Sequence, residues 1–541
     1  MRRWNGWGDE AVSVPLDPDA RAFLDRVVGP GRPAPDATFE ATLAGVPQSA
    51  LSEAHPLVTT DPAERLRHAR GQSLPDWIAM RSGRSGWLPD GVAHPSDRDE
   101  IRTLFRFAAD RGCRLIPYGG GTSVTGHLTP SAGGPPTVTI ALDRLAGLHR
   151  HDDRSGLATF GAGTVGPALE ASLRGRGRTM GHFPQSFELS TVGGWVATRS
   201  AGQQSVGYGR IEALFAGGHL EAPAGPLDLL PVPASAAGPD LRQLILGSEG
   251  RLGILTDATV RTSPLPETER FVAGFLPDFD RGLAAARMLA DERVPVSMVR
   301  LSTPQETATV LAMAGHTSIL ATYRRYLRMR GIGPDRCLVL VAVSGSHGLV
   351  RYGTEQVARL VRAQHGLIDD SIVGRSFGRR WAADRFRSAY LRNTLWEAGY
   401  AVDTVETATT WDRLPDLAVA VAQALRRGLD SESERVHAFS HCSHVYPSGS
   451  SLYTTYVFRR APDPDATLRR WTVLKGAASA AIVGSGGTIS HQHGVGRDHA
   501  PYLPGEIGSL GMAVLADAAR RFDPDRIMNP GVLLGDEVPA G

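Results

Sequence analysis

The sequence predicts an α+β protein in which a domain of two α/β subdomains precedes a second domain of mixed helices and strands. Its 541 residues exceed what one ordinary hydrophobic core supports, so two or more domains are expected. Helix and strand patterns alternate in two passages up to about residue 268, and a long mixed region follows. The composition, 42% hydrophobic and 21% charged, is that of an ordinary globular protein.

The chain divides into four predicted parts. Residues 1–86 are rich in proline, aspartate and arginine, and we expect them to form an N-terminal extension packed on the body of the protein. Residues 87–268 carry the two α/β passages, and residues 269–483 form the mixed domain. Residues 484–541 form a C-terminal segment with a last helix.

The first α/β passage begins with a helix. Ser96 is the expected cap, and apolar side chains recur at helical spacing between Ile101 and Ala108. Gly112 ends this helix, and residues 113–117 are predicted to form a short strand. Alternating apolar residues at 138–142 predict another strand.

The second passage repeats the order of strand, turn and helix. Residues 157–160 are the predicted strand, and a helix that starts with a proline follows at 167–173. The mixed domain then opens with a strand at 271–275 and a helix at 282–289. Near the end of the chain, residues 511–522 are predicted to be helical.

The charge of the chain excludes some function classes. A formal net charge of +2 argues against a nucleic-acid binder that relies on a broad basic field. The 58 basic side chains include a single lysine, Lys475, which indicates a GC-rich bacterial genome and not a phosphate-reading surface.

Cysteine usage and hydropathy indicate the compartment. Cys113, Cys337 and Cys442 lie far apart without CxxC spacing, which fits a reducing compartment with neither disulfides nor a zinc site. No run approaches the roughly 18 apolar residues needed to span a bilayer. We therefore expect a cytoplasmic protein. Peripheral contact with the inner face of the membrane and assembly into a homodimer are open alternatives.

The first motif with chemical content is a run of three glycines after the strand at 113–117. Successive glycines let the backbone approach a ligand, and their N–H groups with two hydroxyls suit a pyrophosphate. The run has neither GxGxxG spacing nor a GK[ST] ending, which disfavours a Rossmann site and a P-loop. A tight structural turn explains it equally well. The expected ligand contacts are Pro117, Gly119, Gly120, Gly121, Thr122 and Ser123.

Two later segments, residues 181–195 and 247–256, combine small residues with hydroxyls. Such segments can run along an extended cofactor and bind it repeatedly through backbone and hydroxyl groups. Each is a modest signal alone, and the three in this order are far more specific. The expected contacts are Pro184, Ser186, Ser190, Thr191, Gly193, Gly194, Glu249, Gly253 and Ile254.

The three segments resemble the PCMH-type FAD-binding domain of the vanillyl-alcohol oxidase / p-cresol methylhydroxylase superfamily. The resemblance implies that the glycine turn holds the FAD pyrophosphate and that residues 484–541 return to this domain and the active site. In some members a histidine in or beside the first loop carries the flavin covalently. Here the loop offers Tyr118 and Thr122, and His127 lies beyond it, so we expect non-covalent FAD.

Within the superfamily, the chain most resembles the alkyldihydroxyacetonephosphate synthase family. The resemblance implies exchange of the acyl group of an acyl-dihydroxyacetone phosphate, a lipid-like small molecule, for a long-chain alcohol. Oxidised FAD would serve as a covalent handle, its N5 bonding the substrate carbon as carboxylate leaves. The motifs that carry the resemblance are Trp4–Gly8, Ser190–Trp195, Val299–Leu301, Glu406–Thr407, Trp411–Arg413, Thr488–Gly496 and Asn529–Gly531.

The resemblance assigns catalytic roles to Tyr453, His491, His493, Arg300 and His182, and substrate-phosphate binding to Arg392. His491 and His493 are the acid/base candidates, since two histidines flanking one residue point the same way in an extended segment. In the family this run holds three histidines, whereas here the middle residue is Gln492, which cannot move a proton at neutral pH.

Plainer interpretations of these residues stay open. Tyr453 could be a half-buried strand aromatic, and Arg392 could lie on the surface. Arg300 sits among apolar neighbours and needs a partner if it is buried. His182 could serve packing alone. A metal pair at His491 and His493 lacks a neighbouring carboxylate or cysteine, so no metal is expected.

Two rival functions remain. The first is an FAD-dependent dehydrogenase or oxidase of a 2-hydroxy acid, such as D-lactate or glycolate, in which FAD accepts a hydride. The run from Thr488 to Gly496 and the N-terminal Trp4–Gly8 favour the synthase type, and Gln492 weakens that preference. The second rival is a flavin-binding scaffold without catalysis.

Overall fold

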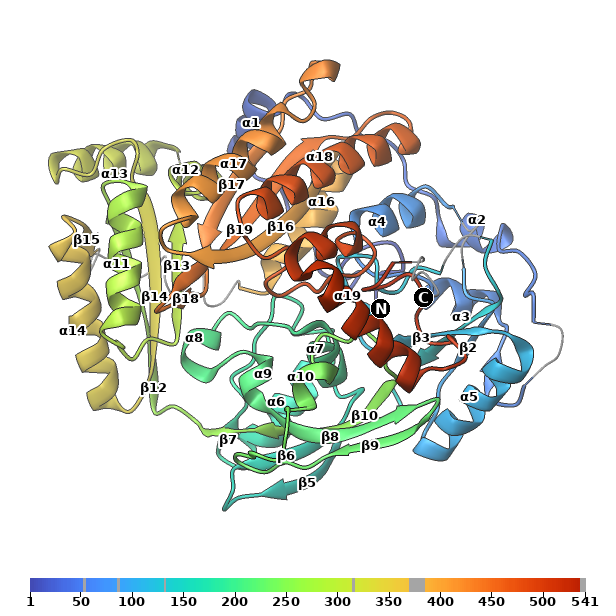
Figure 1. Ribbon diagram of the computed structural model, residues 1–541. Helices are drawn as coiled ribbons and strands as arrows, with labels where there is room; N and C mark the ends of the chain where they lie inside the picture. Colours follow the sequence, from blue (N-terminus) through green and yellow to red (C-terminus); the bar gives the residue numbers. More distant parts are fainter. Residues whose placement is uncertain (52–54, 85–87, 131–132, 314–316, 369–384, 536–541) are drawn as a thin grey trace.

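The computed structural model has the α+β architecture predicted from the sequence, with two main sheets in the two α/β subdomains and a larger sheet in the mixed domain (Figure 1). The predicted domain start at Trp87 lies outside the described residues, and the domain boundaries stay a prediction. The structure describes residues 1–51, 55–84, 88–130, 133–313, 317–368 and 385–535.

In the described part of the N-terminal extension, the chain forms four short helices and one strand. Each helix begins after an Asp, Thr or Ser whose side chain accepts a hydrogen bond from a backbone N–H of the first turn. The strand pairs with β2, so the extension contributes to the first sheet. The elements are α1 (Pro18–Val27), α2 (Phe39–Ala44), β1 (Val58–Thr59), α3 (Pro62–Arg67) and α4 (Leu74–Arg81).

The first subdomain is a four-stranded sheet covered by one long helix. Its strand order is β1-β2-β4-β3, with β2, β4 and β3 parallel. The predicted strand is present as β4, and all its residues are buried, so it is covered on both faces. The elements are β2 (Gly91–Ala93), α5 (Arg98–Arg111), β3 (Arg114–Tyr118) and β4 (Thr137–Ala141).

The predicted cap of α5 is wrong by one residue. Asp97, not Ser96, accepts the hydrogen bond of the first turn, from the N–H of Glu100 at 2.9 Å. Ser96 lies one residue before the cap, where its own N–H and hydroxyl donate to the Glu100 carboxylate. The helix ends at Gly112, whose φ of +63° is the left-handed conformation that glycine adopts readily.

The second subdomain is a five-stranded antiparallel sheet of order β5-β6-β10-β8-β9. The predicted strand and the helix that starts with a proline are both present as β6 and α6. The strands are β5 (Leu148–Asp152), β6 (Leu157–Gly161), β8 (Phe215–Ala222), β9 (Gly225–Leu229) and β10 (Ile254–Arg261), with a separate pair β7 (Arg178–Thr179) and β11 (Ser263–Pro264). The helices are α6 (Gly166–Arg174), α7 (Val192–Thr198), α8 (Ser205–Tyr208), α9 (Ile211–Leu214) and α10 (Arg242–Ile245).

The mixed domain is built on one large antiparallel sheet of order β15-β12-β14-β13-β17-β19-β16, with β18 paired to β19. The strand and helix predicted at its start are β12 and α11, both longer than expected. The strands are β12 (Thr268–Leu276), β13 (Met298–Ser302), β14 (Cys337–Gly345), β15 (Leu367–Ile368), β16 (Tyr400–Thr410), β17 (His437–Cys442), β18 (Val445–Tyr446) and β19 (Gly449–Arg459).

Helices pack on this sheet, and their buried side chains form the largest hydrophobic cluster of the described residues. Figure 1 shows α11 and α14 beside β12 to β14, and α17 and α18 beside β16, β17 and β19. The helices are α11 (Phe279–Asp291), α12 (Pro304–Met313), α13 (Thr317–Met329), α14 (His347–Ala363), α16 (Leu391–Glu397), α17 (Leu414–Arg427) and α18 (Pro464–Gly484), with 3-10 turns at Arg387–Tyr390 and Asp430–Glu432.

The C-terminal segment packs on both FAD-domain sheets. Its helix α19 (Leu503–Phe522), preceded by a 3-10 turn at Ala500–Tyr502, is interrupted at Gly508 and places Ala516 in the core of the second subdomain. Residues 527–529 then run beside β3, where Leu115 donates to the Ile527 carbonyl and accepts from the N–H of Asn529, both at 2.8 Å. Across the described residues, no helix combines the length and the apolar character required to cross a membrane.

Candidate active site

A cavity of about 1060 Å³ lies where the extension, the FAD-binding subdomains, the mixed domain and the C-terminal segment meet. Every residue predicted to contact FAD lines this cavity. Of the residues predicted to act on the substrate, Tyr453, His493, Arg300 and Arg392 also line it, whereas His491 and His182 do not. The structure therefore brings together groups that lie hundreds of residues apart in the sequence.

The glycine turn packs directly against the second predicted segment. A Cβ on Gly120 would lie 1.9 Å from the Leu189 carbonyl oxygen, and one on Gly119 would lie 2.5 Å from Thr191 Oγ1. Only Gly121, with φ of +62°, uses the left-handed conformation. Close approach of two backbones, more than positive φ, is therefore what requires glycine here.

Glu249, in the third segment, joins the C-terminal segment to the cavity. Its carboxylate accepts from the N–H groups of Val495 at 2.5 Å and Gly496 at 2.8 Å, and lies 3.1 Å from His127 Nε2. Asn529 donates to the Glu249 carbonyl at 2.7 Å. Glu249 therefore lines the cavity while its carboxylate is occupied by protein groups.

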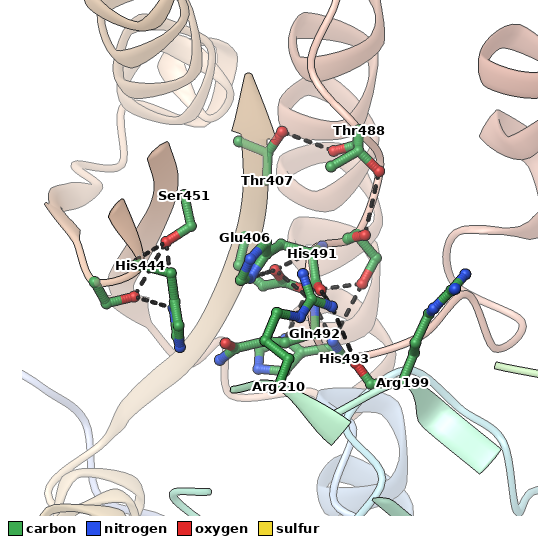
Figure 2. Close-up of polar contacts among 12 residues, drawn as sticks. Arg199, Arg210, Glu406, Thr407, His444, Ser451, Thr488, His491, Gln492 and His493 are labelled. Atoms are coloured by element: carbon green, nitrogen blue, oxygen red, sulfur yellow. Dashed lines mark hydrogen bonds and ion pairs between the residues drawn. The ribbon is translucent and has the colours of Figure 1, made fainter. Parts of the chain in front are cut away.

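Glu406 of β16 organises the loop that carries the two predicted histidines (Figure 2). Its buried carboxylate accepts from the N–H groups of His491 at 2.7 Å, Gln492 at 2.9 Å and His493 at 2.8 Å, and from Ser490 Oγ at 2.7 Å. Burial alone would raise the pKa of Glu406, but the nearby His493 and these hydrogen bonds hold it below its usual value. The sequence motif contained this residue, yet nothing in it indicated the role.

The prediction that His491 and His493 point the same way is wrong. The segment is not extended but bends around the Glu406 carboxylate, so the alternation of a strand does not apply. His493 lines the cavity, whereas His491 Nε2 lies 2.8 Å from the Tyr446 hydroxyl. Burial lowers the pKa of both imidazoles, so they are neutral near pH 7.

Tyr453 of β19 lies between two imidazoles at the cavity wall. Its ring stacks on His441 with centroids 5.1 Å apart and meets His493 edge-on at 5.6 Å. Burial raises the pKa of Tyr453 to about 12. The phenol therefore keeps its proton at neutral pH and can act as a donor.

Arg300 of β13 is half-buried and has an ion-pair partner. Its guanidinium pairs with Glu306 of α12, and the same carboxylate lies 3.1 Å from His441 Nδ1. Burial favours the neutral acid, but the charges of Arg300 and His441 lower the pKa of Glu306 to about 2. Glu306 and His441 also line the cavity, and the sequence reasoning missed both.

Arg392 of α16 is half-buried with its Nη2 atom enclosed by the protein, so the surface interpretation is wrong. Its guanidinium lies 4.2 Å from the Trp77 ring centroid, and Nη1 donates to the Gln72 carbonyl at 2.6 Å. Nη2 has no hydrogen-bond partner among the described residues. The N-terminal motif is fixed next to it, because the side chain of Asn393 bonds both backbone groups of Trp7. Burial lowers the pKa of Arg392 to about 10, which still leaves a cation at neutral pH.

His182 lies outside the cavity lining. Its ring contacts Trp195 with centroids 4.8 Å apart, and Nε2 is 3.3 Å from Ser200 Oγ. Burial lowers its pKa to about 3. The geometry supports a packing role behind the cavity wall in preference to proton transfer.

Part of the cavity wall is apolar. The contributing elements are α1, α12, α16 and strands of the mixed domain, and several of the side chains belong to one buried cluster around Tyr400. The apolar lining includes Leu24, Val310, Met313, Leu395, Phe439 and Val457. Such a wall can bury a hydrocarbon chain, whereas a small polar acid has no apolar chain to place against it.

The residues present fit FAD. The turn at Gly119–Gly121 offers backbone N–H groups to a ligand. Side chains do not fit at these positions, because an added Cβ would lie too close to neighbouring atoms. Asn529 Oδ1, in the cavity wall, has no hydrogen-bond partner among the described residues and can accept from a ligand N–H. Small-molecule sites typically measure roughly 300–1,000 Å³, so this cavity has room for a cofactor together with a substrate.

Comparisons with known proteins agree with this geometry. The FAD binding domain family matches residues 89–225, and the family of FAD linked oxidases, C-terminal domain, matches residues 265–533. Alkyldihydroxyacetonephosphate synthase of Caenorhabditis elegans is 30% identical over 86% of this chain and 79% of its own. The enzyme of the same name from Dictyostelium discoideum is 28% identical over 98% of this chain and 93% of its own.

A solved structure described as an alkyldihydroxyacetonephosphate synthase shares the fold, with a TM-score of 0.80 over 98% of both chains at 24% identity. A hydroxy-acid oxidase subunit, GlcD of Bacillus subtilis, is more distant at 23% identity over 83% of this chain.

Proposed function

Because the chain belongs to the alkyldihydroxyacetonephosphate synthase family of FAD-linked oxidases, we propose that it exchanges the acyl group of an acyl-dihydroxyacetone phosphate for a long-chain alcohol. The products are the alkyl ether and the free fatty acid, with no net oxidation. FAD supplies an electron-poor ring at the reacting carbon and is in the same oxidation state before and after turnover.

The observation that carries this proposal is that one cavity combines a buried guanidinium group that has a free nitrogen with an apolar wall. Arg392 Nη2 offers an N–H pair to an anion, and a phosphate suits the guanidinium fork. The apolar side chains around Leu395 and Val457 suit the acyl or alkyl chain of the same ligand. A 2-hydroxy acid would use the cation and leave the apolar wall without a partner.

The proton transfers are assigned from protonation states. His493, neutral and in the cavity wall, accepts a proton from the substrate carbon or from the alcohol. Tyr453 keeps its proton and donates it to the departing oxygen. Arg300, held by Glu306, places a cation in the same wall. His491 supports the loop through Tyr446, and we withdraw it as a direct proton carrier.

We propose that FAD is held without a covalent bond. Tyr118 and Thr122 flank the glycine turn where some relatives have a histidine, and His127 is paired with Glu249. Denaturation in acid should release all flavin into the supernatant. Yellow colour retained on the precipitated protein would contradict this proposal.

The substrate test compares two classes of compound under anaerobic conditions. The protein is incubated with palmitoyl-dihydroxyacetone phosphate and hexadecanol, and separately with D-lactate and glycolate. The proposal expects an alkyl product without lasting loss of flavin absorbance. Bleaching by a hydroxy acid, without ether product, would instead establish the dehydrogenase. A cytoplasmic location with peripheral membrane contact and a homodimer stay predictions.

A further inference from the structure

Three side chains with metal-binding atoms converge outside the active-site cavity. Glu64 lies in α3, His68 directly follows that helix, and His94 follows β2. Glu64 Oε2 lies 3.4 Å from His68 Nδ1 and 3.6 Å from His94 Nε2. The three side chains are partly exposed, at 34%, 19% and 27%. Solvent therefore reaches the space between them.

The distances between Glu64 Oε2 and the two histidine nitrogens fit coordination of one shared metal ion better than direct hydrogen bonds. Protein N–H···O bonds have lengths of roughly 2.7–3.2 Å, so 3.4 and 3.6 Å are long for that contact. Zinc binds imidazole nitrogen and carboxylate oxygen at about 2.0–2.2 Å in tetrahedral sites, which places neighbouring ligand atoms roughly 3.3–3.6 Å apart. The two distances to Glu64 Oε2 therefore match edges of a zinc tetrahedron. All three ligand atoms lie within 4.8 Å of one another.

A neighbouring carboxylate orients one of the ligands. Asp143 Oδ1 lies 2.7 Å from His94 Nδ1 and accepts a hydrogen bond from its N–H, which leaves the Nε2 lone pair directed towards Glu64. Histidines that bind metals are commonly held in this way by a carboxylate on the other ring nitrogen. His68 Nδ1 also lies 3.0 Å from the Glu64 carbonyl oxygen, so the imidazole turns away from that carbonyl when Nδ1 binds an ion.

We propose that Glu64 Oε2, His68 Nδ1 and His94 Nε2 bind one Zn²⁺ ion, with water as the fourth ligand. Two imidazoles and one carboxylate form a donor set that zinc accepts, and thiolates are not needed. The proposal concerns residues that sequence reasoning passed over, since Glu64 and His68 meet His94 only in the folded chain.

The site would be structural. None of its ligands lines the active-site cavity. The ion would join the end of α3, in the N-terminal extension, to the end of β2 in the first sheet. The His68 ring also lies 5.1 Å from that of Tyr118, the residue before the glycine turn. Zinc would thus brace the strands that carry the turn, and the inference is independent of the proposed reaction.

The test is zinc stoichiometry in untagged protein that has been stripped with a chelator and dialysed against Zn²⁺. Wild type should retain one additional zinc per chain relative to His94→Ala. Co²⁺ substitution should give the intense visible bands of a tetrahedral site in wild type and in the control, but not in His94→Ala. The matched control is His149→Ala, which removes an exposed histidine that pairs with Asp257 and belongs to no cluster of three metal-binding side chains among the described residues.

Asp143→Asn keeps all three ligands and separates metal binding from misfolding. It should weaken zinc binding about 10- to 100-fold, because outer carboxylates contribute that much to zinc affinity. Circular dichroism and bound flavin verify that each variant is folded. Equal zinc content in wild type, His94→Ala and His149→Ala would overturn the proposal, as would cobalt spectra without tetrahedral bands.

Discussion

At the scale of single residues, Glu406 determines where His491 and His493 lie. Its carboxylate accepts three consecutive backbone N–H groups and one hydroxyl, and thereby fixes which histidine reaches the cavity. An Asp or Glu with several backbone donors holds its charge strongly even when it is buried. The orientation of His493 therefore depends on β16, which carries Glu406, as much as on the loop that carries His493.

Glu406→Gln should therefore disturb the loop. The amide NH₂ would face backbone N–H groups, leaving buried donors without an acceptor at a cost of about 1–3 kcal/mol. We expect lower stability in urea and at least a tenfold fall in kcat/KM, with flavin still bound. Glu292→Gln, at an exposed ion pair with Arg359, is the control and should change neither. Equal kinetics for both variants would contradict the assigned role.

The pH dependence follows from the protonation states of two cavity residues. His493 must be neutral, and burial lowers its pKa below the usual value near 6.5, so activity should fall only at pH values below that. Tyr453 must be protonated, and its pKa of about 12 places loss of activity at strongly alkaline pH. We expect a broad plateau of kcat/KM between these limits.

Tyr453→Phe tests the alkaline limb of the pH profile of kcat/KM separately from the acid limb. Removing the phenol should lower kcat by roughly 10²–10⁴-fold, the usual contribution of a general acid, and abolish the alkaline limb. The acid limb should stay, since His493 is retained. An alkaline limb that persists in this variant would assign it to another group.

At the scale of elements, the glycine turn after β3 and the segment before α7 act as one unit. Their backbones touch at Gly120, which sequence alone could not show because the contact joins residues about seventy positions apart. Gly120→Ala should force the two segments apart. Overpacking of this kind costs about 1–3 kcal/mol, so FAD affinity should fall about 10- to 100-fold in a fluorescence titration.

The control for that variant is Gly348→Ala in α14, where an added Cβ meets nothing within 4 Å. It should bind FAD like wild type. Normal FAD binding by Gly120→Ala would mean that the turn can shift to accommodate the added Cβ. It would contradict the requirement for glycine at this close approach.

The sequence predicted elements whose signals are local. The helix at 101–108, the strand at 157–160 and the helix that starts with a proline all carried their own caps or periodicity, and the structure has them. The error at Ser96 arose because Asp97 beside it is an equally good cap. The candidate cofactor residues were identified through motif order, and all of them line one cavity.

What the sequence could not predict depends on contacts between distant residues. Glu306 and His441 lie 135 positions apart, and nothing local marks either one as a partner of Arg300 or Tyr453. The direction of His491 depends on Glu406, which lies on another element. Burial of Arg392 depends on Trp77 in the N-terminal extension.

At the scale of the whole molecule, the cavity is where the parts of the chain meet. Glu249, Asn529 and the loop after Gly494 connect the FAD-binding subdomains to the C-terminal segment. A ligand that binds only the folded state stabilises it by about 2.7 kcal/mol at a hundredfold excess over Kd. FAD should therefore stabilise the junction as well as serve the reaction.

Removal and return of FAD tests this coupling. Flavin-free protein should unfold at a lower temperature and be cleaved faster by protease near the junction, and added FAD should reverse both changes. Riboflavin lacks the pyrophosphate and should restore little. A melting temperature that does not respond to FAD would mean that the parts are held together without it.

The central claim, acyl-for-alkyl exchange in the cavity that Arg392 shares with an apolar wall, has one direct measurement. Under anaerobic conditions, the protein is given palmitoyl-dihydroxyacetone phosphate and hexadecanol labelled with heavy oxygen, and the products are analysed by mass spectrometry. We predict an alkyl product that carries the label, unlabelled palmitate in equal amount, and an oxidised flavin at the end. Release of palmitate without an ether product, or a flavin left reduced, would contradict the account.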